Sequence, residues 1–144
     1  MEDGMGKLTA TLFTSVLSFL SISCGSSNRL QSISISDNTT GPEPLYMASG
    51  TFTNGGNVSS LPVSWFIFGP GIDPPGTGYS LSAAPFLPVC VIGGDTYMIV
   101  AIAPADPHAP QSGPVPANVW NDLVSGKLKS ESGFVGATVQ MTCA

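Results

Sequence analysis

Residues that could perform chemistry are sparse in this chain of 144 residues. The single histidine, His108, lies in the proline-rich stretch "ADPHAP". Nucleophilic catalysis needs a base beside a serine, cysteine or threonine, and the sequence contains no G-x-S-x-G motif that would present a strained serine. A histidine in a proline-flanked loop is more often exposed than catalytic. The sequence therefore predicts a protein that is not an enzyme.

The carboxylates are scattered singly through turn-like sequence, whereas glycoside hydrolysis needs two of them facing one bond. Calcium around Asp73, Asp95 and Asp106 is a weaker alternative, because no D-x-D-x-D-G run supports it. Two cysteines without a histidine cluster fall short of the four ligands of a zinc site. We therefore expect no metal and no cofactor. The acids considered are Asp37, Glu43, Asp73, Asp95, Asp106, Asp122 and Glu131.

Composition restricts the partners and the fold class. Four basic and nine acidic residues give a net charge of -5, so the chain lacks a basic surface for nucleic acid. Charged residues make up 9% of the chain, while 17 glycines and 13 prolines indicate short strands joined by many turns. A hydrophobic content of 42% is too high for a disordered chain. One folded domain is the expectation.

The uncharged apolar stretch 8–23 is too short for a membrane-spanning helix, which needs about 20 residues. It is typical of the core of a signal peptide, here residues 1–23. Lys7 is the only basic residue ahead of it, and a true start at Met5 instead of Met1 would remove the opposing Glu2 and Asp3.

Cys24 follows this stretch directly and precedes "GSSN". The arrangement resembles a bacterial lipobox, although Ser21 stands where that motif usually has leucine. We expect a lipid on Cys24, a polar tether over 24–29, and a membrane partner reached through that anchor. The protein would then be exported to the bacterial cell envelope or extracellular surface. Ordinary cleavage nearby and an uncleaved buried helix are the alternatives.

Period-2 hydrophobic patterns, typical of half-buried strands, recur through the rest of the chain. In 61–68 both faces are apolar, because Leu61, Val63, Trp65 and Ile67 fall on one side and Phe66 and Phe68 on the other. Trp65 is the predicted core residue. The predicted strands cover 30–36, 45–53, 61–68, 84–92, 96–103 and 134–143.

The proline-rich stretch 104–133 interrupts this rhythm and contains one short amphipathic helical pattern at 118–127. Its apolar residues Val119, Trp120 and Leu123 could cover Phe66 and Phe68. An identical subunit could cover them instead, which makes Phe66, Phe68 and Trp120 the candidate interface. Trp120 and Tyr79 could alternatively stack on sugars if they were exposed, although core packing is the commoner role of such residues.

Cys90 and Cys143 both lie in strand-like sequence, and an exported protein meets an oxidising environment. We predict that they form a disulfide; two buried, unpaired thiols are the alternative. The bridge would close 53 residues, which by loop entropy corresponds to about 4 kcal/mol of stabilisation.

The segments "LQSISIS", "YMASGTFTNG", "LPVSW" and "TYMIVAIA" together resemble a bacterial immunoglobulin-like (Big) domain. The resemblance covers about residues 30–143. It implies that the domain, residues 30–144, is an all-β, immunoglobulin-like antiparallel β-sandwich with one short helix in a proline-rich insertion. It implies surface display, adhesion or spacing, with no catalytic residues. The insertion at 104–133 and the Cys90–Cys143 pairing depart from the antibody-type pattern.

The sequence thus predicts a non-enzymatic, lipid-anchored module of the cell surface. A subunit of a self-assembled extracellular fibre or layer and a carbohydrate-binding module are the alternatives, with self-association or a surface protein or glycan as partner. A small hydrolase would need a pocket of converging titratable groups, which the sequence does not indicate.

Overall fold

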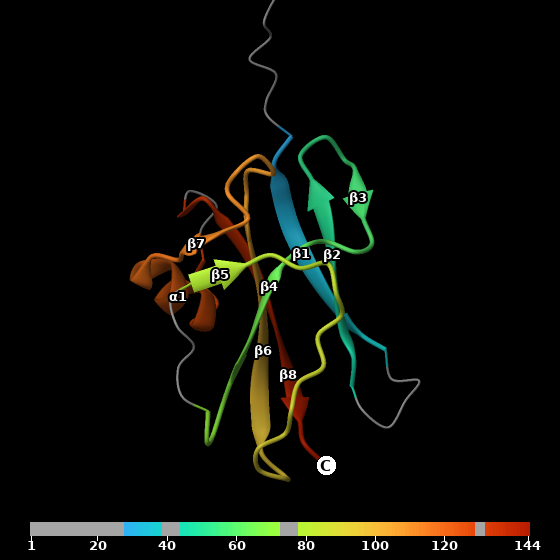
Figure 1. The fold of residues 1–144 in the computed structure, drawn as a ribbon, viewed down its shortest axis with the longest axis vertical. Helices are drawn as coiled ribbons and strands as arrows, with labels where there is room; N and C mark the ends of the chain where they lie inside the picture. The colour runs from blue at the N-terminus through green and yellow to red at the C-terminus, as the bar shows by residue number, and fades with distance from the viewer. Residues whose placement is uncertain (1–27, 39–43, 73–77, 129–131) are drawn as a thin grey trace, which may run out of the picture.

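The computed structural model describes residues 28–38, 44–72, 78–128 and 132–144. Within these ranges the chain is mainly β, with antiparallel sheets and one short helix (Figure 1). The elements are β1 (Leu30–Asp37), β2 (Tyr46–Phe52), β3 (Asn57–Val58), β4 (Ser64–Phe68), β5 (Gly78–Ser80), β6 (Thr96–Pro104), β7 (Ser112–Pro114), α1 (Ala117–Val124) and β8 (Phe134–Thr142).

Strand β6 forms the centre of the fold because its sequence, TYMIVAIAP, carries no charge and is apolar on both faces. It pairs antiparallel with β4 on one side and with β8 on the other. A second antiparallel sheet has the order β1-β2-β3, and β5 pairs with β7. In Figure 1 the β4-β6-β8 sheet lies between the β1-β2-β3 sheet and a layer formed by α1, β5 and β7.

One face of the central sheet packs against the β1-β2-β3 sheet. Tyr97, Ile99 and Ala101 of β6 point toward this side, where they meet Ala48 and Tyr46 of β2. Burial, aided by the nearby charge of Asp37, raises the pKa of Tyr46. The apolar faces of the strands predicted at 30–36 and 45–53 therefore form one side of this core.

The opposite face of the central sheet is covered by α1. Val119, Trp120 and Leu123 are the buried residues of this helix, and they pack with Val100 and Ile102 of β6. The helix ends at Val124, and Gly126, two residues further on, has a φ of 70°, a left-handed conformation that favours glycine. The Gly126 N–H donates to the Leu123 carbonyl and the Lys127 N–H to that of Asp122, so the last turn satisfies its own carbonyls.

The structure corrects two of the predicted strands. The predicted strand at 84–92 does not form; only Phe86 bridges to Tyr46, because Pro85 and Pro88 cannot donate ladder hydrogen bonds. The strand predicted at 61–68 begins at Ser64, although Leu61 and Val63 are buried as expected. Strands β3, β5 and β7 are two or three residues long and escaped prediction.

Helix α1 approaches β8 closely at Gly136, which has no side chain to keep it away. A methyl group added there would overlap the end of the Leu123 side chain. We expect Gly136→Ala to lower the free energy of unfolding by about 1–3 kcal/mol through overpacking.

The matched control for this overpacking is Gly78→Ala, because the atom nearest to a methyl group there is the Gly113 carbonyl oxygen at 3.8 Å. Denaturant unfolding of both variants measures the difference. Equal stability of the two would show that the helix does not press on β8 at Gly136.

Candidate functional site

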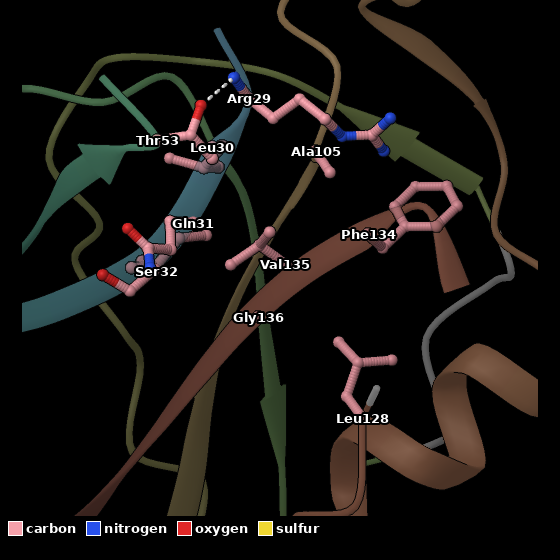
Figure 2. A pocket seen from close by; sticks show the side chains of 11 residues that line it. Arg29, Leu30, Gln31, Ser32, Thr53, Ala105, Leu128, Phe134, Val135 and Gly136 are labelled. Atoms are coloured by element: carbon pink, nitrogen blue, oxygen red, sulfur yellow. Dashed lines mark hydrogen bonds between the residues drawn. The ribbon is translucent and has the colours of Figure 1, made fainter. Parts of the chain in front are cut away.

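The candidate site is a groove between the beginnings of β1 and β8, which we call the β1–β8 groove (Figure 2). The chain brings it together from five separate segments, and its volume is about 490 Å³. The described residues that line it are Arg29, Leu30, Gln31, Ser32, Ile33, Thr53, Ala105, Leu128, Phe134, Val135 and Gly136.

Backbone hydrogen bonds fix the position of the groove. The Leu30 N–H donates to the Ala105 carbonyl at 2.8 Å, and the Arg29 N–H donates to the Thr53 hydroxyl at 3.0 Å. The Thr53 N–H in turn donates to the Arg29 carbonyl at 2.9 Å. These bonds anchor the residues that lead into β1 to the end of β2 and to the end of β6.

The groove combines an apolar floor with a polar rim. Leu30, Ile33 and Val135 contribute apolar surface, and Phe134 packs edge-on against Tyr79 with ring centres 5.6 Å apart. Figure 2 shows the Arg29 side chain extending along the rim, where Gln31 and Ser32 add an amide and a hydroxyl. Such a groove offers apolar contact, hydrogen bonds and one positive charge to an elongated ligand.

The described residues that line the groove include no histidine, cysteine, lysine or carboxylate. His108 is exposed elsewhere, and its backbone N–H donates to the Asp106 carboxylate. Among the described residues, no group of three histidine, cysteine or acidic side chains is placed to hold a metal ion. Asp73 of the suggested calcium cluster lies outside the described residues, as do Glu43 and Glu131.

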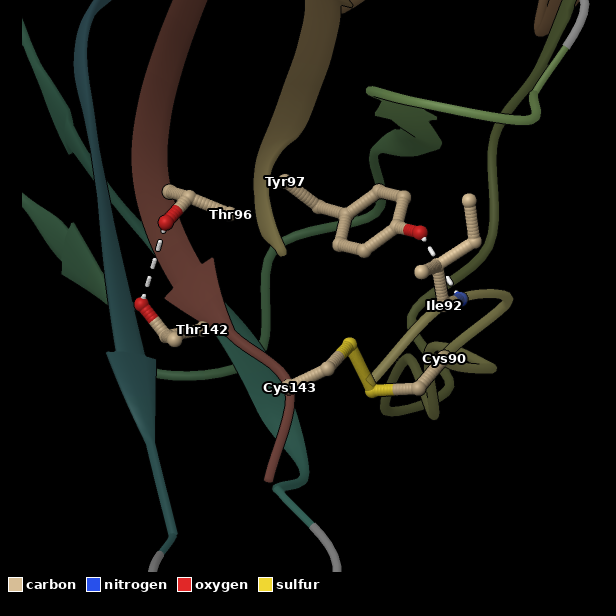
Figure 3. The surroundings of a disulfide bond; sticks show 6 residues. All are labelled: Cys90, Ile92, Thr96, Tyr97, Thr142 and Cys143. Atoms are coloured by element: carbon tan, nitrogen blue, oxygen red, sulfur yellow. Dashed lines mark hydrogen bonds between the residues drawn. A yellow bond between two sulfur atoms is a disulfide. The ribbon is translucent and has the colours of Figure 1, made fainter. Parts of the chain in front are cut away.

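The structure joins Cys90 to Cys143 by a disulfide, with the Cα atoms 5.8 Å apart (Figure 3). Cys143 is buried as predicted and follows the last residue of β8. Cys90 lies in an exposed loop and not in a strand. A disulfide is typical of proteins that meet an oxidising environment.

The predicted core residue Trp65 is half-buried between the two large sheets, where its ring stacks on Phe86 at 5.5 Å. Trp120 is 9% exposed and lies against Phe66 at 4.5 Å and Phe68 at 5.9 Å. Helix α1 therefore covers the two phenylalanines within the chain through Trp120, which is one of the two alternatives that the sequence analysis gives. An interface through these rings stays a prediction.

Three further predictions concern the aromatic residues that could stack on sugars, the N-terminal segment and membrane-spanning helices. Tyr79 and Trp120, the residues considered for sugar stacking, are both buried and present no open ring face. Cys24 and the signal peptide 1–23 lie outside the described residues. Among the helices of the described residues, none has the length and apolar character required to cross a membrane.

Comparisons of the chain with protein-family models, with curated proteins and with solved structures find no match.

Sequence reasoning missed the β1–β8 groove altogether. Arg29 falls in the predicted tether, Thr53 at a strand end and Phe134 at the start of another strand, far apart in the chain. Neither motif nor periodicity links them. The only available signal was the isolated arginine beside the first strand, and this residue type is common at protein surfaces.

Proposed function

We propose that the chain is an exported, lipid-anchored surface module with an immunoglobulin-like fold, which binds a partner and performs no reaction. Export is the premise of this proposal, and the observation that carries it is the Cys90–Cys143 disulfide, which ties the 87–92 loop to the end of β8. Such a bond persists in oxidising compartments and is rare in the cytosol. It supports export, which the apolar 8–23 stretch independently predicts.

The strand order supports the immunoglobulin-like part of the proposal. Immunoglobulin domains pair their third, sixth and seventh strands in one sheet, and their first, second and fifth in the other. Here β4, β6 and β8 pair in that relative order, while β1 pairs with β2 and Phe86 bridges the outer edge of β2. Trp65 on β4 takes the place of the tryptophan on the third strand. The disulfide, which does not join the two sheets near this tryptophan, is the departure.

The β1–β8 groove supports adhesion in preference to passive spacing. It lies where the chain enters β1, from Arg29, the last residue of the predicted tether, to Ile33. A spacer needs no such concave surface, whereas a binding module does. The rim residues Arg29 and Gln31 supply the polar groups that would orient a bound chain.

The lipid anchor is tested by Cys24→Ala. We expect this variant to move from the detergent phase to the aqueous phase when cells are extracted and phase-separated, because alanine cannot carry the lipid whose buried CH₂ groups supply the membrane affinity. The wild-type protein should stay in the detergent phase.

Ser27→Ala, three residues further along the tether, is the matched control and should partition like the wild type. A Cys24→Ala protein that still enters the detergent phase would contradict the lipid anchor.

A further inference from the structure

Strand β8 is an edge strand whose outer backbone groups lack the usual protection. It has nine residues, pairs only with β6, and has no second neighbour in the sheets that the described residues form. Proteins commonly protect an exposed edge with charged residues, prolines or bulges, because its outward N–H and C=O groups can pair with another strand. The β8 sequence, FVGATVQMT, contains no charge and no proline, and its register with β6 is unbroken. None of these three protections is present.

Strand β1 lies beside this edge without pairing to it. The two strands are neighbours in space (Figure 1), yet they belong to different sheets. Strand β1 has a bulge between Leu30 and Ser32, where Gln31 is the extra residue opposite β2. A bulge bends its strand and interrupts the regular spacing of the backbone groups. Of the two facing edges, that of β8 is therefore the one suited to a regular ladder.

The β1–β8 groove gives access to the outer edge of β8. The first three residues of β8, 134–136, line it opposite the beginning of β1 (Figure 2). Ala105 holds the two strands together at this end, because its carbonyl accepts from the Leu30 N–H and its N–H donates to the Gly133 carbonyl. Three residues of a strand extend over about 10 Å, which is enough for an added strand to form main-chain hydrogen bonds.

The groove also carries a positive charge. Arg29 is the one charged residue among the described residues that line it. This residue is exposed, and Figure 2 shows its side chain extending along the rim. The described part of the chain has one more lysine or arginine, Lys127, whereas the whole protein has a net charge of -5. A carboxylate on a partner would therefore be attracted to this groove in preference to most of the surface.

We propose that the β1–β8 groove binds an extended segment of a partner polypeptide, which adds a strand to the outer edge of β8 and places a carboxylate against Arg29. In this mode of binding, main-chain hydrogen bonds supply affinity and alternate side chains point into the groove. Ile33 and Val135 offer apolar contacts to those side chains. The inference rests on the proposed function, because it names the class of partner for the same groove.

A polypeptide fits the groove better than a lipid chain or a sugar does. Backbone N–H and C=O groups repeat along the edge of β8 with the spacing of a strand, and another extended backbone has the same repeat. An acyl chain has no polar groups for this edge or for Arg29. The hydroxyl groups of a sugar do not follow the repeat of a strand.

The test begins with a displayed library of short random peptides, selected against the protein purified from the cells that make it with its disulfide intact. We expect enriched peptides to have apolar residues at alternate positions and at least one aspartate or glutamate. The best peptide is then synthesised, and fluorescence anisotropy measures its affinity.

Methylation of alternate backbone nitrogens gives two versions of this peptide, each of which blocks one edge of its strand. We expect one version to lose at least tenfold in affinity, because it loses the N–H groups that pair with β8. The other should bind like the unmodified peptide, since its methyl groups lie on the edge that faces away.

Variants of the protein locate the binding site. Arg29→Gln should weaken binding of the unmodified peptide by roughly threefold, a usual effect for one exposed ion pair. Lys127→Gln removes the same charge outside the lining residues and should leave the affinity unchanged. Ser32→Trp should abolish binding, because a large ring would fill the groove. Ser36→Trp, at an exposed position on β1 outside the groove, is its control.

Equal affinities of the two methylated peptides would overturn the proposal, because the groove would then not recognise a backbone. A library without enriched peptides, or a peptide that binds Ser32→Trp normally, would overturn it as well. A sugar from a glycan array that binds the wild type but not Ser32→Trp would refute the polypeptide partner and leave the groove as a binding site. Failure of the lipid anchor is detected separately, by the phase partition of Cys24→Ala.

Discussion

Trp120→Ala is expected to lower the free energy of unfolding by about 3–5 kcal/mol, the usual cost of removing a large buried aromatic side chain. The indole is 9% exposed and lies edge-on against Phe66, with ring centres 4.5 Å apart. Phe68 contacts the same ring. Loss of the Trp120 side chain would open a cavity between α1 and the central sheet and leave Phe66 and Phe68 uncovered.

Trp120→Phe distinguishes this packing role from a role of the indole N–H. The Trp120 Nε1 atom is buried and has no hydrogen-bond partner among the described residues, so removing this group sacrifices no bond that they make. We expect Trp120→Phe to cost well under half of what alanine costs in denaturant unfolding. If alanine and phenylalanine destabilised the protein equally, or if alanine cost less than about 1 kcal/mol, the helix would not be the cover of this face.

Removing the disulfide should have an effect of similar size. The Cys90–Cys143 bond has a sequence separation of 53 residues. By loop entropy, the double variant Cys90→Ser and Cys143→Ser should be less stable by about 4 kcal/mol. The paired substitution avoids leaving a single reactive thiol, and unfolding by denaturant measures the loss.

The reductant provides an internal control for the disulfide. Reduction of the wild type should lower its stability to nearly that of the double variant, whereas the double variant should not respond. A double variant as stable as the oxidised wild type would mean that the bond does not constrain the unfolded chain.

The sequence was most informative where one local pattern determines the structure. The 96–103 segment was predicted to be a strand, and it forms β6 (Thr96–Pro104). The spacing of Val119, Trp120 and Leu123 likewise predicted the face of α1 that is buried. The coarse fold class, mainly antiparallel β with one short helix, and the disulfide are confirmed.

Other features depend on contacts that no local pattern contains. The 84–92 segment is apolar enough for a strand, but Pro85 and Pro88 cannot donate ladder hydrogen bonds, and the segment forms only the bridge from Phe86 to Tyr46. Its aliphatic residues are exposed. Trp65 has the right phase for the core but is only half-buried. The β1–β8 groove requires the ends of β1, β2, β6 and β8 to meet, which follows from topology alone.

Mass spectrometry of the native protein, isolated from the membranes of the cells that produce it, tests the proposed function most directly. We predict a mature chain that begins at Cys24, with a lipid on that residue and with Cys90 and Cys143 joined. The lipid on Cys24 would demonstrate anchoring, and the Cys90–Cys143 disulfide would demonstrate passage through an oxidising compartment. A chain that begins elsewhere with an unmodified Cys24, or that carries free thiols at positions 90 and 143, would contradict the proposal.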